Sequence, residues 1–549
     1  MTRLFLRDNC NKEKLLRDLK FGYRADWAPG TRPHPQKHVR NHFKVESAIK
    51  KCRSRFLNEI KKGRMLGGLG WSRLVVEKFL RRPFYTIPCG AVPKNDDPHG
   101  RIIHNFSFPS PDFGSVNSAL QNTTVSYISF KERTKKLDSV DWFLKVDLKD
   151  GYRQLPVHPS DWHTQIYSLG ANEYYIDLCM PFGKANSSVV FCTWTSAWCE
   201  AFKFHFQRIT GIKIRLASYV DDFFGGPVRT GNLELDKRNA ENLKRSLIEI
   251  GELTRTKMNI KKCVGPLRIL DILGLTYDSI HRKCYLSASK IHKYSLRLRS
   301  LLSFLSATSK DLQKLVGNLV FAAWVIPYGR PFISHISKLI NPKRPHLLVA
   351  IDNHCITACK VWLILLARHR GLSFDFILGR LPYHRNEWFV DASSSFGYGG
   401  ICGSRFFMIA HPEVNAFLLS MQEPLRKPLF IAYEELLAVL LAFVQFAALA
   451  PGSFIRINSD NDSVVSWVNS GRCSRKWGFI FLAAVEFFKA KYQLKVKAFH
   501  IPSSHNSSAD SLSRGRTPRW LKERGSRKPV NIRFLFELIN YPEKFWRKL

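Results

Sequence analysis

The pattern of apolar and polar positions predicts two regions of mixed strands and helices with a mainly helical segment between them. Short apolar runs punctuated by Pro and Gly begin near residue 83, and one of them, "WFLKVDLKDGY", predicts a buried strand that ends at Asp147. Residues 187–211 have no internal Gly or Pro and stop at Gly211, which predicts a long helix with a glycine stop. The stretch "RLASYVDDFFGG", residues 215–226, predicts a strand, a tight Asp-Asp turn and a second strand, because Asp tolerates left-handed backbone.

Helices are also predicted around residues 43–62 and over most of residues 286–340, where Thr308 and Asp311 have the spacing of a capping box. From residue 387 the order is strand, glycine turn, strand, long helix, strand, helix, strand and helix, which is typical of an α/β domain of about 130 residues. The apolar stretch at 436–450 is too short to span a bilayer and predicts a buried helix.

The charge balance adds the strongest indication of a partner. The chain has 549 residues with 85 Lys plus Arg against 44 Asp plus Glu, a net charge of +41, which indicates a polyanion and first of all nucleic acid. A hydrophobic content of 45% is typical of a folded protein and excludes a disordered one. The N-terminus lacks the apolar core of a secretory signal, and the twelve cysteines include no CxxC pair. These features predict an intracellular protein of the cytoplasm, the nucleus or both, with reduced thiols and no membrane partner.

Three acids follow apolar strands in the first mixed region. Asp147 ends one strand, and Asp221 and Asp222 lie on the turn of another. Neighbouring strands would bring the three carboxylates to one edge of a sheet, where they repel one another. A pair of Mg²⁺ ions, with Mn²⁺ as a substitute, removes this conflict and supports phosphoryl transfer. Because an isolated Asp-Asp pair is more often turn chemistry, the prediction of nucleotide-chain extension depends on the flanking motifs.

These motifs resemble the palm of reverse transcriptases, in family order over residues 85–280: "VDLKDGYRQLPVHP", "MPFGKANSSVVF", "YVDD", "KMNIKKC" and "ILGLTYD". The resemblance implies that Asp147, Asp221 and Asp222 bind the metals and that Leu273 and Gly274 lie near the primer grip. It also implies substrate contacts from Lys94 and Arg101 in the fingers, Tyr152 beneath the incoming sugar, Phe182, Gly183, and Lys261 or Lys262 near the triphosphate. Surface charge remains an alternative for Lys94 and Arg101, and a core position for Tyr152.

Two positions depart from the family pattern. Lys184 stands where an apolar residue is expected, and "NSS" replaces the usual Ala/Ser-Pro. These departures bear on how a template is positioned and leave the metal-binding acids intact.

A second set of acids follows in the second mixed region: Asp391, Glu435, Asp460 and Asp510, with His500 ten residues before the last. Acids at strand ends and helix starts of a small α/β domain can hold two further metals, and a histidine beside them can move a proton. Their order and the ending "HIPSSHNSSADSLSR" resemble ribonuclease H, which implies two Mg²⁺ ions at this site. Three of the five have neighbouring alternatives. Glu434 is the alternative to Glu435. Asp462, which we interpret as a helix cap, is the alternative to Asp460, and His505, which we interpret as solvated, is the alternative to His500.

The predicted fold class is α+β and α/β multidomain: a right-hand polymerase of fingers, palm and thumb, followed by a ribonuclease H-like domain. The resemblance implies an RNA-directed DNA polymerase with ribonuclease H activity that acts on an RNA template, a DNA primer, dNTPs and an RNA–DNA hybrid. The motifs "EIKKGRMLGG", "GSVNSAL" and "LQKLVGNLVFAAWVIPYGRPFI" are most similar to DIRS-type retrotransposons, which encode a tyrosine recombinase. A catalytically decayed or domesticated nucleic-acid-binding module is the alternative, and the oligomeric state stays open. The predicted domains are a basic extension (1–80), fingers and palm (81–280), thumb and connection (281–385), a ribonuclease H-like domain (386–515) and a basic tail (516–549).

Overall fold

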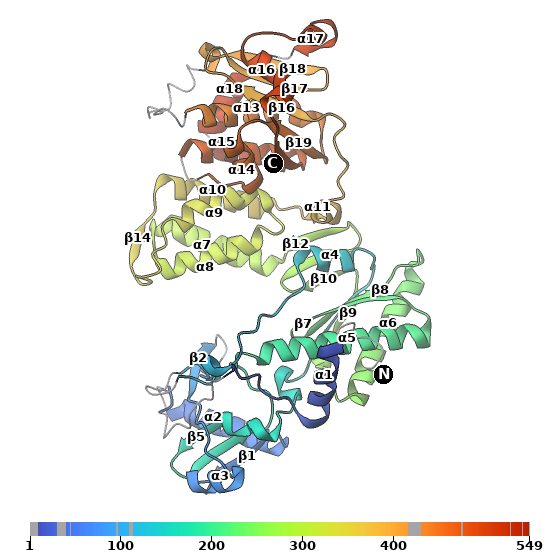
Figure 1. The fold of residues 1–549 in the computed structure, drawn as a ribbon, viewed down its shortest axis with the longest axis vertical. Helices are drawn as coiled ribbons and strands as arrows, with labels where there is room; N and C mark the ends of the chain where they lie inside the picture. The colour runs from blue at the N-terminus through green and yellow to red at the C-terminus, as the bar shows by residue number, and fades with distance from the viewer. Residues whose placement is uncertain are drawn as a thin grey trace. The chain divides into compact units, whose positions relative to one another are not determined.

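The structure is a computed structural model of the full chain and divides into two compact units, Met1–Leu270 and Asp271–Leu549 (Figure 1). Each unit mixes helices and strands, which confirms the predicted mixed, multidomain architecture. The described residues are 9–29, 40–43, 46–94, 97–108, 114–414, 430–473, 476–527, 529–540 and 542–547.

A four-stranded antiparallel sheet of order β7-β8-β4-β9 forms the centre of the first unit. Its strands are β4 (Phe143–Asp147), β7 (Ile214–Tyr219), β8 (Asp222–Pro227) and β9 (Val264–Leu267). The helices α5 (Ser187–Thr210) and α6 (Leu233–Leu253) pack against this sheet (Figure 1). The predicted glycine stop of α5 is confirmed, because Gly211 has a left-handed φ of 69° and its N–H bonds back to Gln207.

One face of this sheet forms a core with the two helices because alternate strand positions are apolar. Leu144 and Val146 of β4 and Phe223 of β8 belong to the same buried cluster as Phe191 of α5 and Leu243 of α6. Full burial of one such side chain stabilises the fold by roughly 1.5–3 kcal/mol. The alternation leaves Lys145 and Asp147 on the opposite, less buried face of β4.

The rest of the first unit surrounds a smaller sheet of order β1-β6-β5 and the hairpin β2-β3. Buried Arg153, in the turn after β4, connects this sheet to the helix over residues 46–61, because its guanidinium donates to the Asp177 carboxylate at 2.7 Å and to the Glu59 carboxylate at 3.0 Å. The remaining elements are α1 (Asn9–Phe21), α2 (Glu46–Lys61), β1 (Met65–Leu69), α3 (Arg73–Leu80), β2 (Cys89–Lys94), β3 (Asp97–His104), α4 (Phe130–Leu137), β5 (Ile166–Gly170) and β6 (Glu173–Asp177). The predicted helix around residues 43–62 is confirmed as α2.

The first part of the second unit is mainly helical, as predicted for residues 286–340. Thr308 caps α8 by accepting a hydrogen bond from the Asp311 N–H, which confirms the predicted N-cap. A four-stranded sheet of order β10-β11-β12-β15 precedes and flanks these helices. The elements are β10 (Ile269–Ile272), β11 (Leu275–Asp278), β12 (Lys283–Leu286), α7 (Ala288–Phe304), β13 (Ser306–Thr308), α8 (Ser309–Ala322), α9 (Arg330–Ser337), β14 (Leu348–Ala350), α10 (Asn353–Ala367), β15 (Leu372–Ser373) and α11 (Phe374–Leu378).

A six-stranded sheet of order β20-β19-β16-β17-β18-β21 organises the remainder of the second unit. The strands β16 (Trp388–Ala392), β19 (Phe454–Ser459) and β20 (Lys495–His500) run parallel, so their carboxyl ends meet at one edge of the sheet. Helix α13 (Phe430–Phe446) packs on one face, where Trp388 contacts Phe443 and Phe446. Helix α16 (Ser507–Ser513) packs on the other face, where Ile401 clusters with Leu512.

The predicted element order of this region is confirmed except for two omissions. Strand β18 (Arg405–Ala410) and helix α15 (Lys476–Tyr492) are present between predicted elements. The other elements are β17 (Gly397–Cys402), α14 (Asp462–Ser470), α17 (Arg519–Arg524), β21 (Ser526–Arg527), α18 (Ile532–Asn540) and α19 (Pro542–Trp546). The predicted domain boundaries remain predictions.

The apolar stretch at 436–450 begins within α13 and is buried, as predicted. Residues Ile431–Leu449 are long and apolar enough to cross a membrane by length and composition, but 72% of this window is buried inside the protein. Leu440 and Leu441 are 0% exposed, which is typical of a core helix.

Candidate active sites

The first candidate site lies where β4 ends beside the β7–β8 hairpin. The strands β4 and β8 are antiparallel neighbours, and Asp147 pairs directly with Asp222 in their register. Asp221 lies on the turn, and its carbonyl accepts a hydrogen bond from the N–H of Leu148 at 2.8 Å. The prediction that these two strands are neighbours is therefore confirmed, and all three acids lie at one edge of the sheet.

The turn differs from the predicted Asp-Asp turn. Its two central residues are Val220 and Asp221, while Asp222 already belongs to β8 and pairs with Tyr219. The left-handed residue is Val220, with a φ of 56°, so the expectation that an Asp adopts this conformation is wrong. A β-branched residue rarely adopts positive φ, so the tertiary structure holds this turn in a strained conformation.

Two lysines approach the acids of the first site. The Lys262 ammonium lies 3.3 Å from Asp147 Oδ2, and the Lys145 ammonium lies 3.4 Å from Asp222 Oδ1. Burial, aided by neighbouring carboxylates, raises the pKa of Asp221 and of Asp222 above its usual range. Divalent cations offset this repulsion, and a carboxylate set of this kind matches the oxygen ligands that Mg²⁺ prefers.

Tyr152 lies beside these acids on a 3₁₀ turn that follows β4. Its ring centroid is 4.8 Å from that of Phe182 and 4.5 Å from that of Phe191, so the ring is half-buried rather than fully in the core. A Cβ on Gly151 would lie 3.9 Å from both Asp221 Oδ2 and the Phe182 ring. Tyr152, Phe182 and Asp221 thus lie close together around Gly151.

Gly183 is required by its surroundings. Its φ is 96°, and an added Cβ would lie 2.7 Å from the carbonyl oxygen of His104. Its own carbonyl accepts a hydrogen bond from the Asn117 side chain at 2.9 Å. The segment after Phe182 is therefore fixed against β3.

The other residues predicted for substrate contact are placed as follows. Arg101 is exposed on β3, whereas the Lys94 side chain lies outside the described residues. Lys261 lies beside Lys262 in a 3₁₀ turn. Leu273 and Gly274 form the tight β10–β11 turn of the second unit, with φ values of 49° and 79°.

Lys184, the departure from the family pattern, is only 3% exposed. Its ammonium donates to the Thr164 hydroxyl at 3.1 Å and lies 5.7 Å from the centre of the Trp27 ring. Burial lowers the pKa of this lysine to about 8. The side chain therefore points into the interior of the first unit.

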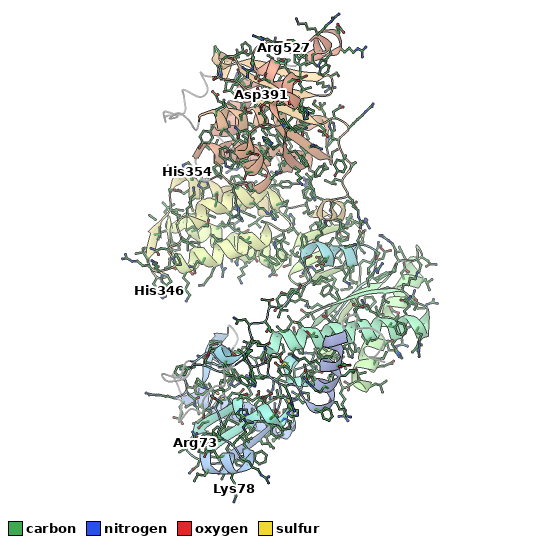
Figure 2. The ribbon with its side chains drawn as sticks, viewed as in Figure 1. Arg73, Lys78, His346, His354, Asp391 and Arg527 are labelled. Carbon is green, nitrogen blue, oxygen red and sulfur yellow. The ribbon has the colours of Figure 1, made fainter. Side chains whose placement is uncertain are left out.

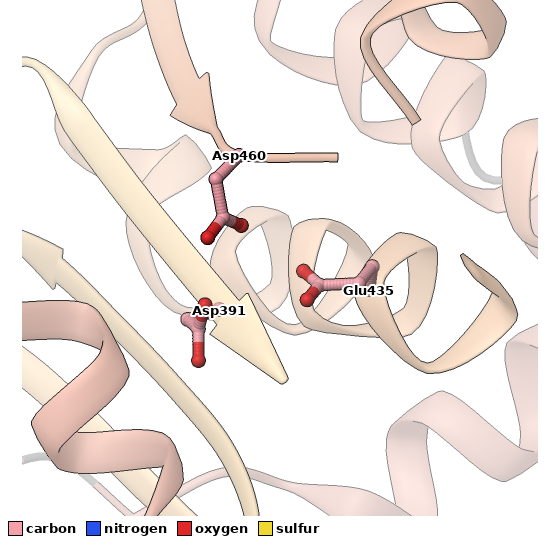
Figure 3. A group of neighbouring side chains, drawn as sticks. All are labelled: Asp391, Glu435 and Asp460. Carbon is pink, nitrogen blue, oxygen red and sulfur yellow. The ribbon is translucent and has the colours of Figure 1, made fainter. Parts of the chain in front are cut away.

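The second candidate site joins acids from three elements around the β16 strand end (Figure 3); Figure 2 labels Asp391 within the second unit. Asp391 lies on β16, Glu435 on α13, and Asp460 directly after β19. One carboxylate oxygen from each lies within 4.8 Å of the other two. In the described part of the chain no other group of three acidic, histidine or cysteine ligands is this close, so the acids of the first site are spaced more widely.

Burial and mutual repulsion change the protonation of this cluster. Burial, with Asp391 and Asp460 nearby, raises the pKa of Glu435 to about 9. Burial also raises the pKa of Asp391 to about 7, although a hydrogen bond from Ser513 opposes the shift. Glu435 Oε2 is buried and has no hydrogen-bond partner among the described residues. A buried oxygen without a partner, in a cluster of three carboxylates, fits a divalent cation.

Sequence reasoning missed the side chains that orient these acids. The hydroxyl of Ser513 donates to Asp391 Oδ2, and the Asn506 amide donates to Asp391 Oδ1 at 3.4 Å. The hydroxyl of Ser503 donates to Asp460 Oδ2 at 2.6 Å. The polar run "PSSHNSSADSLSR" contains all three residues, and its density of Ser and Asn is the one sequence signal that points to them.

Asp510 and His500 lie at the margin of this cluster. Asp510 bonds the Arg514 guanidinium at 2.8 Å, and its charge contributes to the raised pKa of Asp391. His500 Nε2 lies 3.2 Å from the backbone carbonyl oxygen of Asp460, and the ring is 45% exposed. Both residues therefore adjoin the three acids without belonging to the closest group.

The structure distinguishes the alternative residues Glu434, Asp462 and His505 from the residues of this site. Glu434 is buried with its carboxylate 3.8 Å from His411 Nδ1, outside the close group that Glu435 joins. Asp462 is 88% exposed, and the cap of α14 is Asn461, so the interpretation of Asp462 as the helix cap is wrong by one residue. His505 is exposed, as expected.

Comparisons with known proteins agree with the first site. Residues 96–277 match the family model described as "Reverse transcriptase (RNA-dependent DNA polymerase)", so the chain carries a reverse transcriptase region over about a third of its length. This region contains Asp147, Asp221 and Asp222. No curated protein matches the sequence.

Three solved structures of the foamy virus protease-reverse transcriptase are similar to this chain, each over 91% of its length. The complex with an RNA/DNA hybrid is 14% identical, with a TM-score of 0.46 over 62% of its chain. The form called dRH, in complex with double-stranded DNA, is 14% identical with a TM-score of 0.46 over 80% of its chain. A further complex with double-stranded DNA is 13% identical with a TM-score of 0.44 over 96% of its chain.

Proposed function

We propose that this chain is an RNA-directed DNA polymerase whose active site is formed by Asp147, Asp221 and Asp222. The observation that carries the proposal is the direct cross-strand pairing of Asp147 with Asp222, next to a strained turn that presents Asp221, inside the reverse transcriptase region. Two Mg²⁺ ions, when bound, activate an attacking hydroxyl and stabilise a leaving oxygen.

The residues of this chain have separate tasks in the proposed reaction. The three acids hold the metals, and the α-phosphate of a dNTP is attacked in line by the primer 3′-hydroxyl with release of pyrophosphate. Lys262, 3.3 Å from Asp147 and 65% exposed, is able to turn from the carboxylate to a phosphate. Tyr152, packed against Phe182, forms the floor beneath the sugar. Gly183 keeps the segment after Phe182 in place through its bond to Asn117.

The proposal includes a ribonuclease H activity at the second site. Its support is the convergence of Asp391, Glu435 and Asp460 within 4.8 Å, with a buried Glu435 oxygen that has no other partner among the described residues. Ser513 and Asn506 hold the Asp391 carboxylate, and Ser503 holds that of Asp460. We assign Asp510 as the fourth metal-binding acid and His500 as a proton carrier, because both adjoin the cluster, Asp510 from a half-buried position and His500 from an exposed one.

The two activities together suit a retroelement that copies its RNA into DNA. Copying leaves an RNA–DNA hybrid, and a nuclease on the same chain removes the RNA strand, which its 2′-hydroxyls distinguish. The net charge of +41 supports contact with the phosphate backbones of template, primer and hybrid. The proposal places the protein in the cytoplasm, the nucleus or both, which cell fractionation tests.

We assign the element to the DIRS type on the motifs "EIKKGRMLGG", "GSVNSAL" and "LQKLVGNLVFAAWVIPYGRPFI". The test is the genomic DNA around the coding sequence. A neighbouring open reading frame for a tyrosine recombinase supports the assignment, whereas an aspartic protease and a zinc-type integrase contradict it.

Primer extension on an RNA template tests the polymerase. Asp221→Asn should lower incorporation at least 100-fold, because it removes a metal-binding charge from the site. Asp141→Asn, also in the first unit but outside the cluster, is the matched control and should retain activity. An active Asp221→Asn variant would contradict the assignment.

Degradation of a labelled RNA–DNA hybrid tests the nuclease. Asp460→Asn should stop RNA cleavage and spare primer extension, while Asp221→Asn should do the reverse. Loss of both activities in either variant would argue against two separate sites. A wild-type protein that binds the hybrid but shows neither activity would instead support the non-catalytic binding module.

A further inference from the structure

A cavity of about 480 Å³ opens on the surface of the second unit, and none of the acids of either candidate site lines it. It is bordered by the end of α10, the strands β12 and β15, and the end of α15. None of its lining residues takes part in the proposed polymerase or nuclease chemistry. Its volume falls in the range of small-molecule sites, which is about 300–1,000 Å³.

Four cations line this cavity: Lys283, Arg368, Arg370 and Lys491. Among the described lining residues there is no Asp or Glu, and none of the four cations makes an ion pair with a described carboxylate. The Lys283 ammonium instead donates to the backbone carbonyl of Arg370 at 3.4 Å, which brings two of the cationic residues together. Arg368, Arg370 and Lys491 are exposed and Lys283 is half-buried, so the four charges lie around the mouth of the cavity, where an anion would be attracted to all of them.

Tyr328 gives the cavity a second feature that points to a ligand. The residue lines the cavity and is 6% exposed, and its hydroxyl has no hydrogen-bond partner among the described residues. Burial raises the pKa of this hydroxyl above its usual range, with the charge of Glu486 adding to the effect, so the group stays protonated and is a donor. A buried hydroxyl without a partner costs about 1–3 kcal/mol, and a ligand acceptor that displaces the side chains now covering this oxygen removes that cost.

The remaining wall is apolar. Ile326, Leu365, Leu372 and Phe376 line it, and the Phe376 ring centroid lies 6.2 Å from that of Tyr328. The cavity therefore has an apolar side, a cationic side and one buried hydroxyl without a partner among the described residues. This division suits a ligand that carries several phosphates and also has a less polar part.

We propose that this cavity binds a phosphate-bearing anion, with the four cations on its phosphates and the Tyr328 hydroxyl donating to one of its oxygens. Guanidinium groups bond phosphate through two parallel N–H donors, and ammonium groups bind it as point charges. The same chemistry is offered by a free nucleotide or polyphosphate and by the backbone phosphates of a nucleic-acid strand. The proposal does not depend on polymerase or nuclease activity.

The first experiment compares two double variants of equal charge change in the full-length protein. Arg368→Ala with Arg370→Ala removes cations from the cavity, and Lys343→Ala with Arg344→Ala removes exposed cations elsewhere in the second unit. Binding of inorganic tripolyphosphate, dATP and an RNA–DNA hybrid is measured in EDTA, so that metal-dependent dNTP binding is absent. The cavity variant should weaken at least one of these probes about 10-fold, and the control should change it less than twofold. Equal weakening by both variants would overturn the proposal, because it would indicate non-specific attraction to a basic protein.

The response to the separate probes identifies the source of the anion. A cavity-specific loss with tripolyphosphate or dATP alone indicates a free small anion, and a loss with the hybrid alone indicates a strand. A response to neither class would overturn the site.

Tyr328→Phe keeps the ring and removes only the hydroxyl. Without ligand its melting temperature should equal or exceed that of the wild type, because a buried donor without a partner is lost. Its affinity for the responding probe should fall about fivefold. A lower melting temperature combined with unchanged affinity would show that the hydroxyl serves the fold and would overturn its role in the site.

Discussion

Replacing Glu435 with glutamine separates the effect of this carboxyl group on stability from its role in RNA cleavage. In the metal-free protein the pKa of Glu435 is raised to about 9 from 4.5. The folded protein therefore keeps a proton that the unfolded chain releases across this interval. Its free energy of unfolding consequently falls as pH rises from about 4.5 to 9.

The magnitude follows from the size of this shift. At pH 7.5 the side chain is held protonated about 3 pH units above its ordinary pKa, which costs about 4 kcal/mol at about 1.4 kcal/mol per unit. Glutamine has nearly the same shape and does not ionise. Burying its amide without hydrogen-bond partners costs about 2 kcal/mol, which offsets about half of the gain. We therefore expect Glu435→Gln to stabilise the metal-free protein by about 2 kcal/mol at pH 7.5, while it abolishes RNA cleavage.

The assay is thermal unfolding of the full-length protein in EDTA at several pH values between 5 and 9. The variant should melt about 4–8 °C higher at pH 7.5, and the difference should vanish near about pH 6 and reverse towards pH 5. Mg²⁺ should raise the melting temperature of the wild type more than that of the variant, because the variant keeps only the site in the first unit intact. Glu523→Gln, whose side chain is 57% exposed, is the matched control and should follow the wild type. A variant that is less stable than the wild type at every pH would refute the reasoning.

Three further outcomes are expected from single substitutions. Tyr152→Ala should admit ribonucleotides in primer extension, because the ring packed on Phe182 no longer crowds the 2′-hydroxyl; unchanged discrimination between rNTP and dNTP would count against this position. Val220→Gly should relieve the left-handed valine and stabilise the first unit by about 1 kcal/mol in urea unfolding, and destabilisation would show that the turn is unstrained. Lys184→Met should stabilise the protein by about 2 kcal/mol at pH 7, because burial lowers the lysine pKa from 10.5 to about 8. This gain should diminish as pH rises from 8 to 10.5, where the wild-type lysine loses its proton in the folded state first. A gain that is constant across this range would contradict buried charge as the reason.

Local patterns predicted the parts of the fold that short segments determine. The strand ending at Asp147, the helix ending at Gly211 and the cap at Thr308 each depend on residues within a few positions of one another. The register that pairs Asp147 with Asp222 joins segments 75 positions apart, and only the family order of the motifs suggested it.

Long-range contacts determine what the sequence did not reveal. Val220, rather than an Asp, takes the left-handed conformation because pairing of Tyr219 with Asp222 sets the turn. Ser513 reaches Asp391 across 122 positions because α16 packs on the sheet, and the Ser-rich run around it does not distinguish this serine from its neighbours. The cationic cavity likewise draws Lys283, Arg370 and Lys491 from three distant segments, and in a chain with 85 basic residues none of them stands out.

The central claim is that distant acids form two separate metal sites, and cleavage of the protein backbone by bound Fe²⁺ tests it most directly. Fe²⁺ in place of Mg²⁺ generates radicals that cut the chain near its ligands when ascorbate and peroxide are added. We expect two sets of fragments. Cuts near Asp147 and the 220–222 turn should be lost in Asp222→Asn. Cuts near Asp391 and Asp460 should be lost in Asp460→Asn. Cuts at neither position, or loss of both sets in a single variant, would contradict it.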